Sequence, residues 1–110
     1  MTYGLVGKFT AQPGRRDELR DLLLEAAQLL EADPGCLQYL VGTAPGDDDG
    51  VWVWVTELWT DRAAHAASLE PEEVRAVIQQ ARPLIAGMSD RTELDVHGGK
   101  GLPVGTRGRD

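Results

Sequence analysis

The chain has 110 residues, of which 42% are hydrophobic and 26% are charged. These values are typical of a single soluble domain, and the chain is too short for two independent cores. Its formal net charge of -7 argues against nucleic acid and anionic membranes as partners, because both would repel it at long range.

Two further features concern location and redox chemistry. The sequence has no basic leader with an apolar segment and no apolar run long enough to span a bilayer, so we expect a cytoplasmic protein with no membrane partner. Cys36 is the only cysteine, which excludes an internal disulfide and a metal cluster held by thiolates. We expect its thiol to pack as a small hydrophobic group.

The first part of the chain predicts a strand followed by an amphipathic helix. Apolar and polar residues alternate over residues 3–11, as in a strand, which Pro13-Gly14 then ends. Over residues 15–32 leucines and alanines recur at helical spacing, with charged residues on the opposite side. Residues 33–35 (DPG) then stop the helix and turn the chain.

A second strand is predicted at residues 36–43, and a polar loop at residues 44–50 follows it. The loop contains three consecutive aspartates at residues 47–49, which suggest a magnesium or calcium site. Such ions need oxygen ligands that converge, whereas adjacent side chains on a flexible turn diverge. We therefore expect a solvated turn.

The most apolar stretch, residues 51–59 (VWVWVTELW), predicts a central strand. Alternation divides it into two faces, one with Val51, Val53, Val55, Glu57 and Trp59 and the other with Trp52, Trp54, Thr56 and Leu58. Both faces are apolar, and one layer of helices covers only one of them. The other face needs a cover from the same chain or from a second copy.

The remaining elements are two helices and a strand. Thr60 or Asp61 can cap a short alanine-rich helix that carries His65. A longer helix is predicted to begin at residues 70–73 (EPEE) and to break or kink at Pro83. Its apolar stripe comprises Val74, Val77, Ile78, Ala81 and Ile85. Residues 92–97 form the last predicted strand.

This order of elements predicts an α+β fold of the ferredoxin-like, split β-α-β type (β-α-β-β-α-β), with an antiparallel four-stranded sheet and both helices on one face. The opposite face of the sheet is bare in a monomer. Burial of a few large apolar side chains there supplies on the order of 10 kcal/mol before the costs of association. We therefore expect a homodimer through the sheet face.

The composition also divides the chain into a domain at residues 1–97 and a glycine-rich tail at residues 98–110. Our hypothesis for the tail is an arm laid across a partner subunit.

Several segments occur in the order seen in a known family, namely residues 8–23 (KFTAQPGRRDELRDLL), 34–41 (PGCLQYLV), 56–69 (TELWTDRAAHAASL) and 74–87 (VRAVIQQARPLIAG). Together they resemble the antibiotic-biosynthesis-monooxygenase (ABM) domain of the dimeric α+β barrel superfamily. The resemblance extends over residues 3–97. It implies a homodimer whose sheets pack face to face, with an apolar cavity in each subunit between sheet and helices.

The resemblance also implies a monooxygenase that uses molecular oxygen to convert an aromatic phenol, anthrone or hydroquinone to a quinone, without a metal or flavin cofactor. An ionised phenol is electron-rich enough to pass an electron to oxygen. The protein therefore needs only to bind the ring, favour its anion and keep water away.

The same resemblance assigns roles to individual residues. Trp59 would form a wall of the cavity, which would send Trp52 and Trp54 to the dimer interface. His65 would accept or relay the phenolic proton, and Tyr39 would hydrogen-bond the developing oxyanion. The candidate substrate-binding residues are Tyr39, Val55, Val77 and Ile85.

Each role has a structural alternative. Trp59 can be core packing, and Tyr39 can be a core residue whose hydroxyl is satisfied. His65 can be half of a surface ion pair with Asp61, four residues earlier.

Glu57 needs a partner in its apolar strand, for which Arg82 or another arginine is the candidate. The family's haem-degrading branch uses an asparagine with Trp and His, and this chain has no asparagine, so haem cleavage is not expected. His65 and His97 alone fall short of a metal site, and we expect none.

Three functions remain open at this point. A cofactor-independent monooxygenase predicts an enclosed apolar cavity reached by His65 and Trp59. A non-catalytic homodimer that binds a small molecule predicts the same cavity with no titratable group near its centre. A structural or interaction protein predicts a cavity filled by side chains such as Met88 and Ile85.

Overall fold

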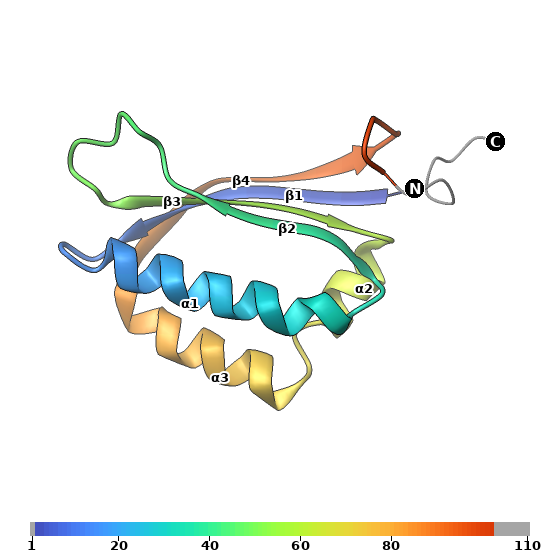
Figure 1. The fold of residues 1–110 in the computed structure, drawn as a ribbon, viewed down its shortest axis with the longest axis horizontal. Helices are drawn as coiled ribbons and strands as arrows, with labels where there is room; N and C mark the ends of the chain where they lie inside the picture. The colour runs from blue at the N-terminus through green and yellow to red at the C-terminus, as the bar shows by residue number, and fades with distance from the viewer. Residues whose placement is uncertain (1, 103–110) are drawn as a thin grey trace.

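The computed structural model describes residues 2–102, which form one four-stranded antiparallel sheet with helices packed on one face (Figure 1). The elements in chain order are β1 (Thr2–Ala11), α1 (Arg16–Leu29), β2 (Cys36–Gly42), β3 (Trp52–Trp59), α2 (Arg62–Ala67), α3 (Glu72–Ala81) and β4 (Ile85–Val96). Short 3-10 turns follow α1 and α3, at Leu30–Ala32 and Arg82–Leu84. The strand order is β2-β3-β1-β4, so the predicted ferredoxin-like α+β fold is confirmed. Among the described residues, no helix has the length and apolarity needed to cross a membrane.

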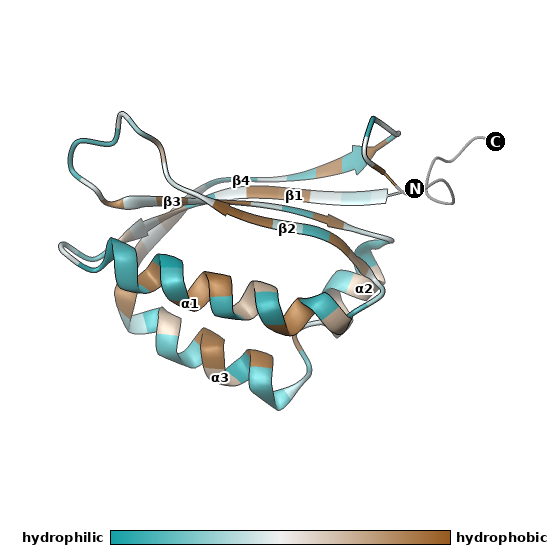
Figure 2. Ribbon diagram, in the orientation of Figure 1, coloured by the Kyte–Doolittle hydropathy of each residue, from teal (hydrophilic) through white to brown (hydrophobic). Residues whose placement is uncertain are grey.

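The core lies between the sheet and the helices α1 and α3, as the predicted faces of β3 require. Val53, Val55 and Trp59 are 0%, 4% and 1% exposed. Leu19 on α1 is also fully buried, and hydrophobic residues recur along both long helices (Figure 2). Alternation along β3 therefore fixes which of its side chains meet the helix layer.

The last strand is longer than predicted. The helical stripe was expected to continue to Ile85 and the strand to begin at residue 92, but α3 ends at Ala81 and β4 begins at Ile85. Pro83 lies in the 3-10 turn, which agrees with the predicted break. The prediction of Ile85 as a helical residue was wrong because residues 85–91 pair with β1, a long-range interaction that local propensity does not contain.

A bulge in β4 also broke the alternation that would have revealed this strand. The pairing shifts between Val6 opposite Thr92 and Lys8 opposite Ser89, so that Asp90 and Arg91 together oppose one residue of β1. Asp90 adopts a left-handed backbone conformation with φ 56. Because of the extra residue, even-numbered residues such as Met88 face the helices before the bulge, whereas odd-numbered residues such as Glu93 face them after it.

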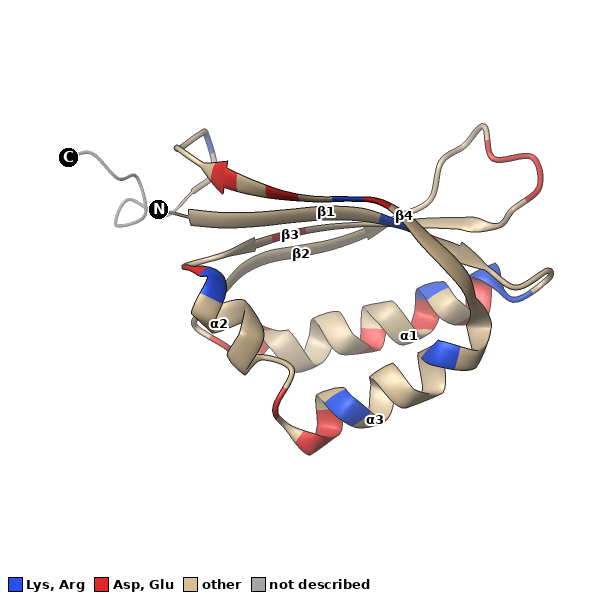
Figure 3. Cartoon of the chain, turned by 180° about the vertical axis from the view of Figure 1, so that it is seen from behind, with Lys and Arg blue, Asp and Glu red and all other residues tan. Residues whose placement is uncertain are grey.

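The acidic loop between β2 and β3 is organised by one of its three aspartates (Figure 3). The Asp47 carboxylate accepts hydrogen bonds from the backbone N–H groups of Gly50, Val51 and Trp52 at 3.1, 2.9 and 2.8 Å. Arg16 lies 3.9 Å from the same carboxylate. The expected solvated turn is therefore only partly correct, because the Asp47 side chain is 2% exposed.

The face of the sheet opposite the helices is apolar and exposed. Leu40, Trp52 and Leu94 are 58%, 37% and 45% exposed. The Lys8 ammonium lies over the rings of Trp52 and Trp54, at 4.2 and 5.0 Å from their centroids. The helices α1 and α3 lie on the other side of the sheet and do not cover this face (Figure 1).

The predicted arm falls largely outside the described residues. Residues 99–102 form a turn, with a hydrogen bond from the Leu102 N–H to the Gly99 carbonyl at 3.4 Å. The division into a domain at residues 1–97 and a tail at residues 98–110 stays a prediction.

Candidate functional site

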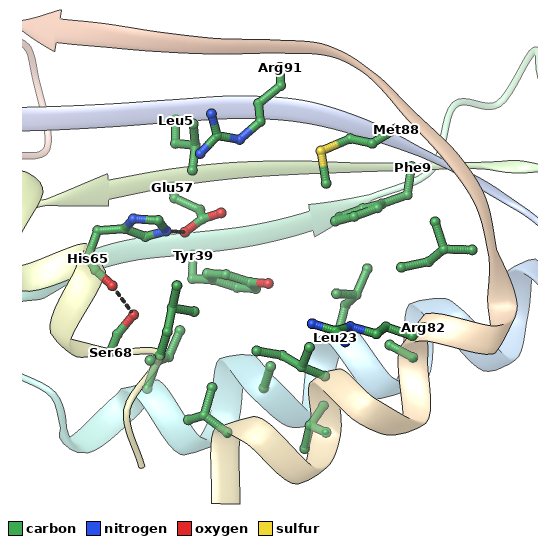
Figure 4. Close-up of a pocket in the computed structure, with 18 of the residues that line it drawn as sticks. Leu5, Phe9, Leu23, Tyr39, Glu57, His65, Ser68, Arg82, Met88 and Arg91 are labelled. Atoms are coloured by element: carbon green, nitrogen blue, oxygen red, sulfur yellow. Dashed lines mark hydrogen bonds and ion pairs between the residues drawn. The ribbon is translucent and has the colours of Figure 1, made fainter. Parts of the chain in front are cut away.

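A cavity of about 350 Å³ lies between the sheet and the helices (Figure 4). Most of its walls are apolar side chains from β1, α1, α3 and β4. Its polar and charged lining residues are Tyr39, Glu57, His65, Ser68, Arg82 and Arg91.

Five of the six predicted site residues line this cavity. They are Tyr39, Trp59, His65, Val77 and Ile85. The sixth, Val55, is buried in the core and lines only a smaller neighbouring cavity of about 40 Å³.

His65 is positioned by the way α2 is attached to the end of β3. The Asp61 carboxylate caps the helix by accepting a hydrogen bond from the Ala64 N–H at 2.7 Å. The Thr60 N–H donates to the Gly35 carbonyl at 2.9 Å, and a Cβ at Gly35 would lie only 2.8 Å from that of Ala64. Glycine at residue 35 thus allows α2 to approach closely enough to direct His65 over β3.

A polar cluster of three side chains stands at this end of the cavity. The Trp59 indole N–H donates to Glu57 Oε1 at 3.0 Å, and His65 Nε2 lies 3.8 Å from the same oxygen. The imidazole also packs edge-on against Trp59, with ring centroids 5.3 Å apart. His65 therefore faces Glu57, and Asp61 is occupied by its capping bond, so the alternative of a surface pair with Asp61 was wrong.

Burial brings the pKa values of Glu57 and His65 closer together. It raises the pKa of Glu57, against the opposing effects of the Trp59 hydrogen bond and the charge of Arg91. It lowers the pKa of His65, and the charge of Arg91 lowers it further. The imidazole is therefore uncharged at neutral pH, and its 3.8 Å contact with Glu57 is a polar contact, longer than a hydrogen bond.

Tyr39 presents a protonated hydroxyl to the cavity. Burial, followed by the charge of Glu57, raises the pKa of its phenol well above the usual value. The group therefore remains a hydrogen-bond donor throughout the range in which proteins are folded. Among the described residues, no side chain or backbone group forms a hydrogen bond with it.

A second network fastens α2 to β4 beside the cavity. The Tyr3 hydroxyl donates to Glu93 at 2.7 Å, and the Arg62 guanidinium donates to both oxygens of the same carboxylate, at 2.6 and 3.4 Å. The Tyr3 ring also lies against His65, with centroids 5.6 Å apart. These two hydrogen-bonding partners hold the pKa of Glu93 below its ordinary value.

The model of the antibiotic biosynthesis monooxygenase (ABM) family matches residues 2–80, most of the chain. The chain belongs to this family. A proposed member from Chloroflexus aurantiacus is 41% identical, with a TM-score of 0.83 over 94% of this chain and 100% of that one. No curated protein sequence matches the chain.

More distant structures share the ABM fold. A proposed ABM protein from Caulobacter crescentus is 23% identical, with a TM-score of 0.76 over 86% of this chain and 89% of its own. SnoaB, a cofactor-independent oxygenase from Streptomyces nogalater, is 17% identical, with a TM-score of 0.74 over 90% of this chain and 96% of its own. At these identities the likeness concerns the fold.

Sequence reasoning missed some of the charged groups in the cavity of this ABM protein. Glu57 was expected to need a partner, for which Arg82 or another arginine was the candidate. Its hydrogen bond comes from Trp59, and the arginine whose charge acts on it is Arg91. Arg91 was not named individually, because the bulge that turns it inward cannot be read from alternation. The sequence did contain one signal for the cluster, because Glu57 lies two residues before Trp59 and therefore on the same inner face of the strand.

The remaining candidates for metal or redox chemistry lie outside this cluster. Within residues 2–102, no group of three or more His, Cys, Asp or Glu side chains is arranged to hold a metal ion. Cys36 is half-buried against the core around Trp59, and burial raises the pKa of its thiol to about 11. It therefore stays a neutral thiol, in agreement with the packing role predicted for it.

Proposed function

We propose that this ABM protein is a cofactor-independent monooxygenase that oxidises an aromatic phenol, anthrone or hydroquinone to a quinone. The observation that carries the proposal is the polar cluster of Glu57, His65 and Trp59 at one end of a mostly apolar cavity. Such a cavity suits a flat aromatic substrate that must lose a proton before it reacts with oxygen. Membership of the ABM family supports the same reaction class.

The proposed chemistry balances with oxygen as the only oxidant. For an anthrone, the substrate loses a proton to the protein, and the resulting anion passes an electron to O₂. Carbon–oxygen bond formation followed by cleavage of the O–O bond leaves one oxygen atom in the new carbonyl and releases the other as water. The protein binds the ring, accepts and returns the proton, and excludes water from the intermediates.

The pair of His65 and Glu57 is suited to accept that proton. Both groups lie where burial disfavours their charged forms, so neither is locked in one protonation state by a strong ion pair. The two groups are close enough to titrate as a unit. Tyr39, held protonated, is the candidate donor to the oxygen that becomes negative.

The geometry favours this function over the two alternatives. A binding protein without chemistry predicts no titratable group within hydrogen-bond reach of the cavity centre. Glu57 and His65, which both line the cavity, are the candidates for such a group. A structural protein predicts a cavity filled by Met88 and Ile85, whereas these side chains stand in its wall and leave about 350 Å³ open.

We further propose that a second copy of the chain covers the open face of the sheet. The support is the set of exposed apolar side chains there, of which Leu40 is 58% exposed. A surface of this kind is a common mark of an interface, and symmetric pairing lets each subunit cover the other.

Oxygen uptake tests the proposed reaction. Purified, metal-free protein should consume oxygen with a panel of anthrones and hydroquinones, saturably and in the presence of a chelator. His65→Ala and Glu57→Gln should each lower the rate by about a hundredfold, the effect of losing a positioned proton acceptor. Because burial lowers the pKa of His65, the wild-type rate should persist below about pH 6.5 and fall only at more acidic pH.

The matched control is His97→Ala, which removes the other histidine, an exposed residue outside the cavity, and should leave the rate unchanged. Trp59→Phe keeps an aromatic wall but removes the hydrogen bond to Glu57, so it should shift the pH profile. Uptake no faster than autoxidation across the panel would count against catalysis and favour the non-catalytic binding dimer.

A further inference from the structure

Two arginines line the apolar cavity in addition to the polar cluster. Arg91 lies opposite Gly7 in the bulge of β4, and Arg82 follows the last residue of α3 (Figure 4). Among residues 2–102, no side chain forms an ion pair or a hydrogen bond with either guanidinium group. Neither guanidinium group is therefore paired with a side chain of these residues.

The electrostatic surroundings of the two arginines differ. The charge of Arg91 acts on Glu57, where it opposes the rise in pKa that burial causes. It also acts on Glu93, where it adds to the lowering of the pKa by Tyr3 and Arg62, so Arg91 stands among anions of the protein. Arg82 has no comparable partner among the described residues. In a protein with a formal net charge of -7, the cavity thus contains two guanidinium groups against the single carboxylate of Glu57.

Arg82 also stands at the opposite end of the cavity from the proposed proton acceptor. His65 packs on Trp59, which pairs with Tyr3 at the start of β1. Arg82 precedes Ile85, which pairs with Ala11 at the end of β1. A substrate whose ring reaches His65 would therefore present its far side to Arg82.

We infer that the substrate of this cavity is an aromatic compound with an anionic substituent, a carboxylate, and that Arg82 binds this group while the reacting ring lies at His65. The inference rests on the proposed function. Arg82 is exposed, so the substituent remains partly hydrated and need not lose all its water. The planar guanidinium offers paired donors that match the two oxygens of a carboxylate.

Binding of two matched ligands tests the inference without relying on turnover. The probes are anthraquinone-2-carboxylate and anthraquinone-2-carboxamide, which share ring and shape and differ in charge, titrated calorimetrically into the full-length protein. The wild type should bind the carboxylate more tightly. Arg82→Gln should reduce this preference by about tenfold, and Arg82→Glu should reverse it.

The matched control is Arg75→Gln, which removes an exposed arginine on α3 that does not line the cavity and should leave the preference intact. Equal binding of the two probes by the wild type, binding of neither, or a preference that survives Arg82→Gln would overturn the inference. Oxygen uptake is measured separately. A carboxylate preference without oxygen uptake would therefore support the Arg82 binding site and contradict the proposed oxygenase. Oxygen uptake without the preference would support the oxygenase and contradict the binding site.

Discussion

The two faces of β3 use tryptophan in opposite ways. On the inner face Trp59 is 1% exposed, donates a hydrogen bond to Glu57 and forms part of the cavity wall. On the outer face Trp52 is 37% exposed and lies beneath the ammonium group of Lys8. One strand thus lines the cavity with one face and forms a broad, exposed apolar surface with the other.

This difference shows that the helix layer, rather than the strand sequence, determines whether an apolar residue of β3 is buried or exposed. Both faces were equally apolar in sequence, and only the inner one is covered by α1 and α3 (Figure 1). The covered face is left with a gap because the helices do not fill the space above Trp59 and Glu57. The uncovered face presents exposed apolar side chains and suits a flat partner surface.

The largest expected effect is on stability, from truncation on the inner face. Trp59→Ala should lower the free energy of unfolding by about 3–5 kcal/mol, because it removes a fully buried indole. In the monomer Trp52→Ala should cost only about 1 kcal/mol, mainly its contact with Lys8. Urea titration of each variant measures both values. Similar losses at the two positions would contradict the assignment of the faces.

The next effect should appear in association. Leu40→Glu places a charge on the open face and should raise the dissociation constant of the proposed dimer by about a hundredfold, or about 3 kcal/mol. Leu24→Glu is the control, because Leu24 is 45% exposed on α1, away from that face. Sedimentation equilibrium distinguishes them. Dissociation by Leu24→Glu rather than by Leu40→Glu would place the interface on the helix side.

The smallest effect concerns the loop that leads into β3. Three backbone hydrogen bonds, that from Trp52 foremost, lower the pKa of Asp47. Its carboxylate therefore stabilises the fold fully above its unfolded pKa of about 3.9, and this contribution is lost as pH falls through the lower folded value. Asp47→Asn should be less stable than the wild type at neutral pH, and the two should converge in acid.

Asp48→Asn is the matched control for this titration, because Asp48 is the exposed neighbour. Its melting temperature should follow that of the wild type at every pH. A constant difference between Asp47→Asn and the wild type down to pH values below both pKa values would show that the carboxylate charge is not what stabilises the loop.

Most of the fold could be predicted from the sequence because it depends on local patterns. Alternation identified β1, β2 and β3, and helical spacing with capping residues identified the three helices, with boundaries near those observed. β4 was only half predicted, since residues 85–91 owe their strand conformation to pairing with β1. Cytoplasmic location and the tail as an arm stay predictions.

The candidate site could be predicted less completely. Trp59 and His65 were identified because a strand end followed by a capped helix brings them together, and both line the cavity. Val55 lines only the smaller neighbouring cavity, which could not be foreseen because alternation gives the face of a residue but not its depth in the core. Arg91 was missed because its orientation depends on a bulge, and bulges shift side chains between faces without a local signal.

The bulge at Asp90 has an evolutionary consequence. With uninterrupted alternation from Met88, which faces inward opposite Phe9, Arg91 and Glu93 would turn to the outer face and Thr92 would enter the interior. Loss of the Asp90 codon would remove the bulge but leave Arg91 opposite Gly7 and Glu93 opposite Leu5, so both side chains would keep their inward direction. The bulge thus allows β4 to differ by one residue in length without exchanging the inward and outward side chains beyond it.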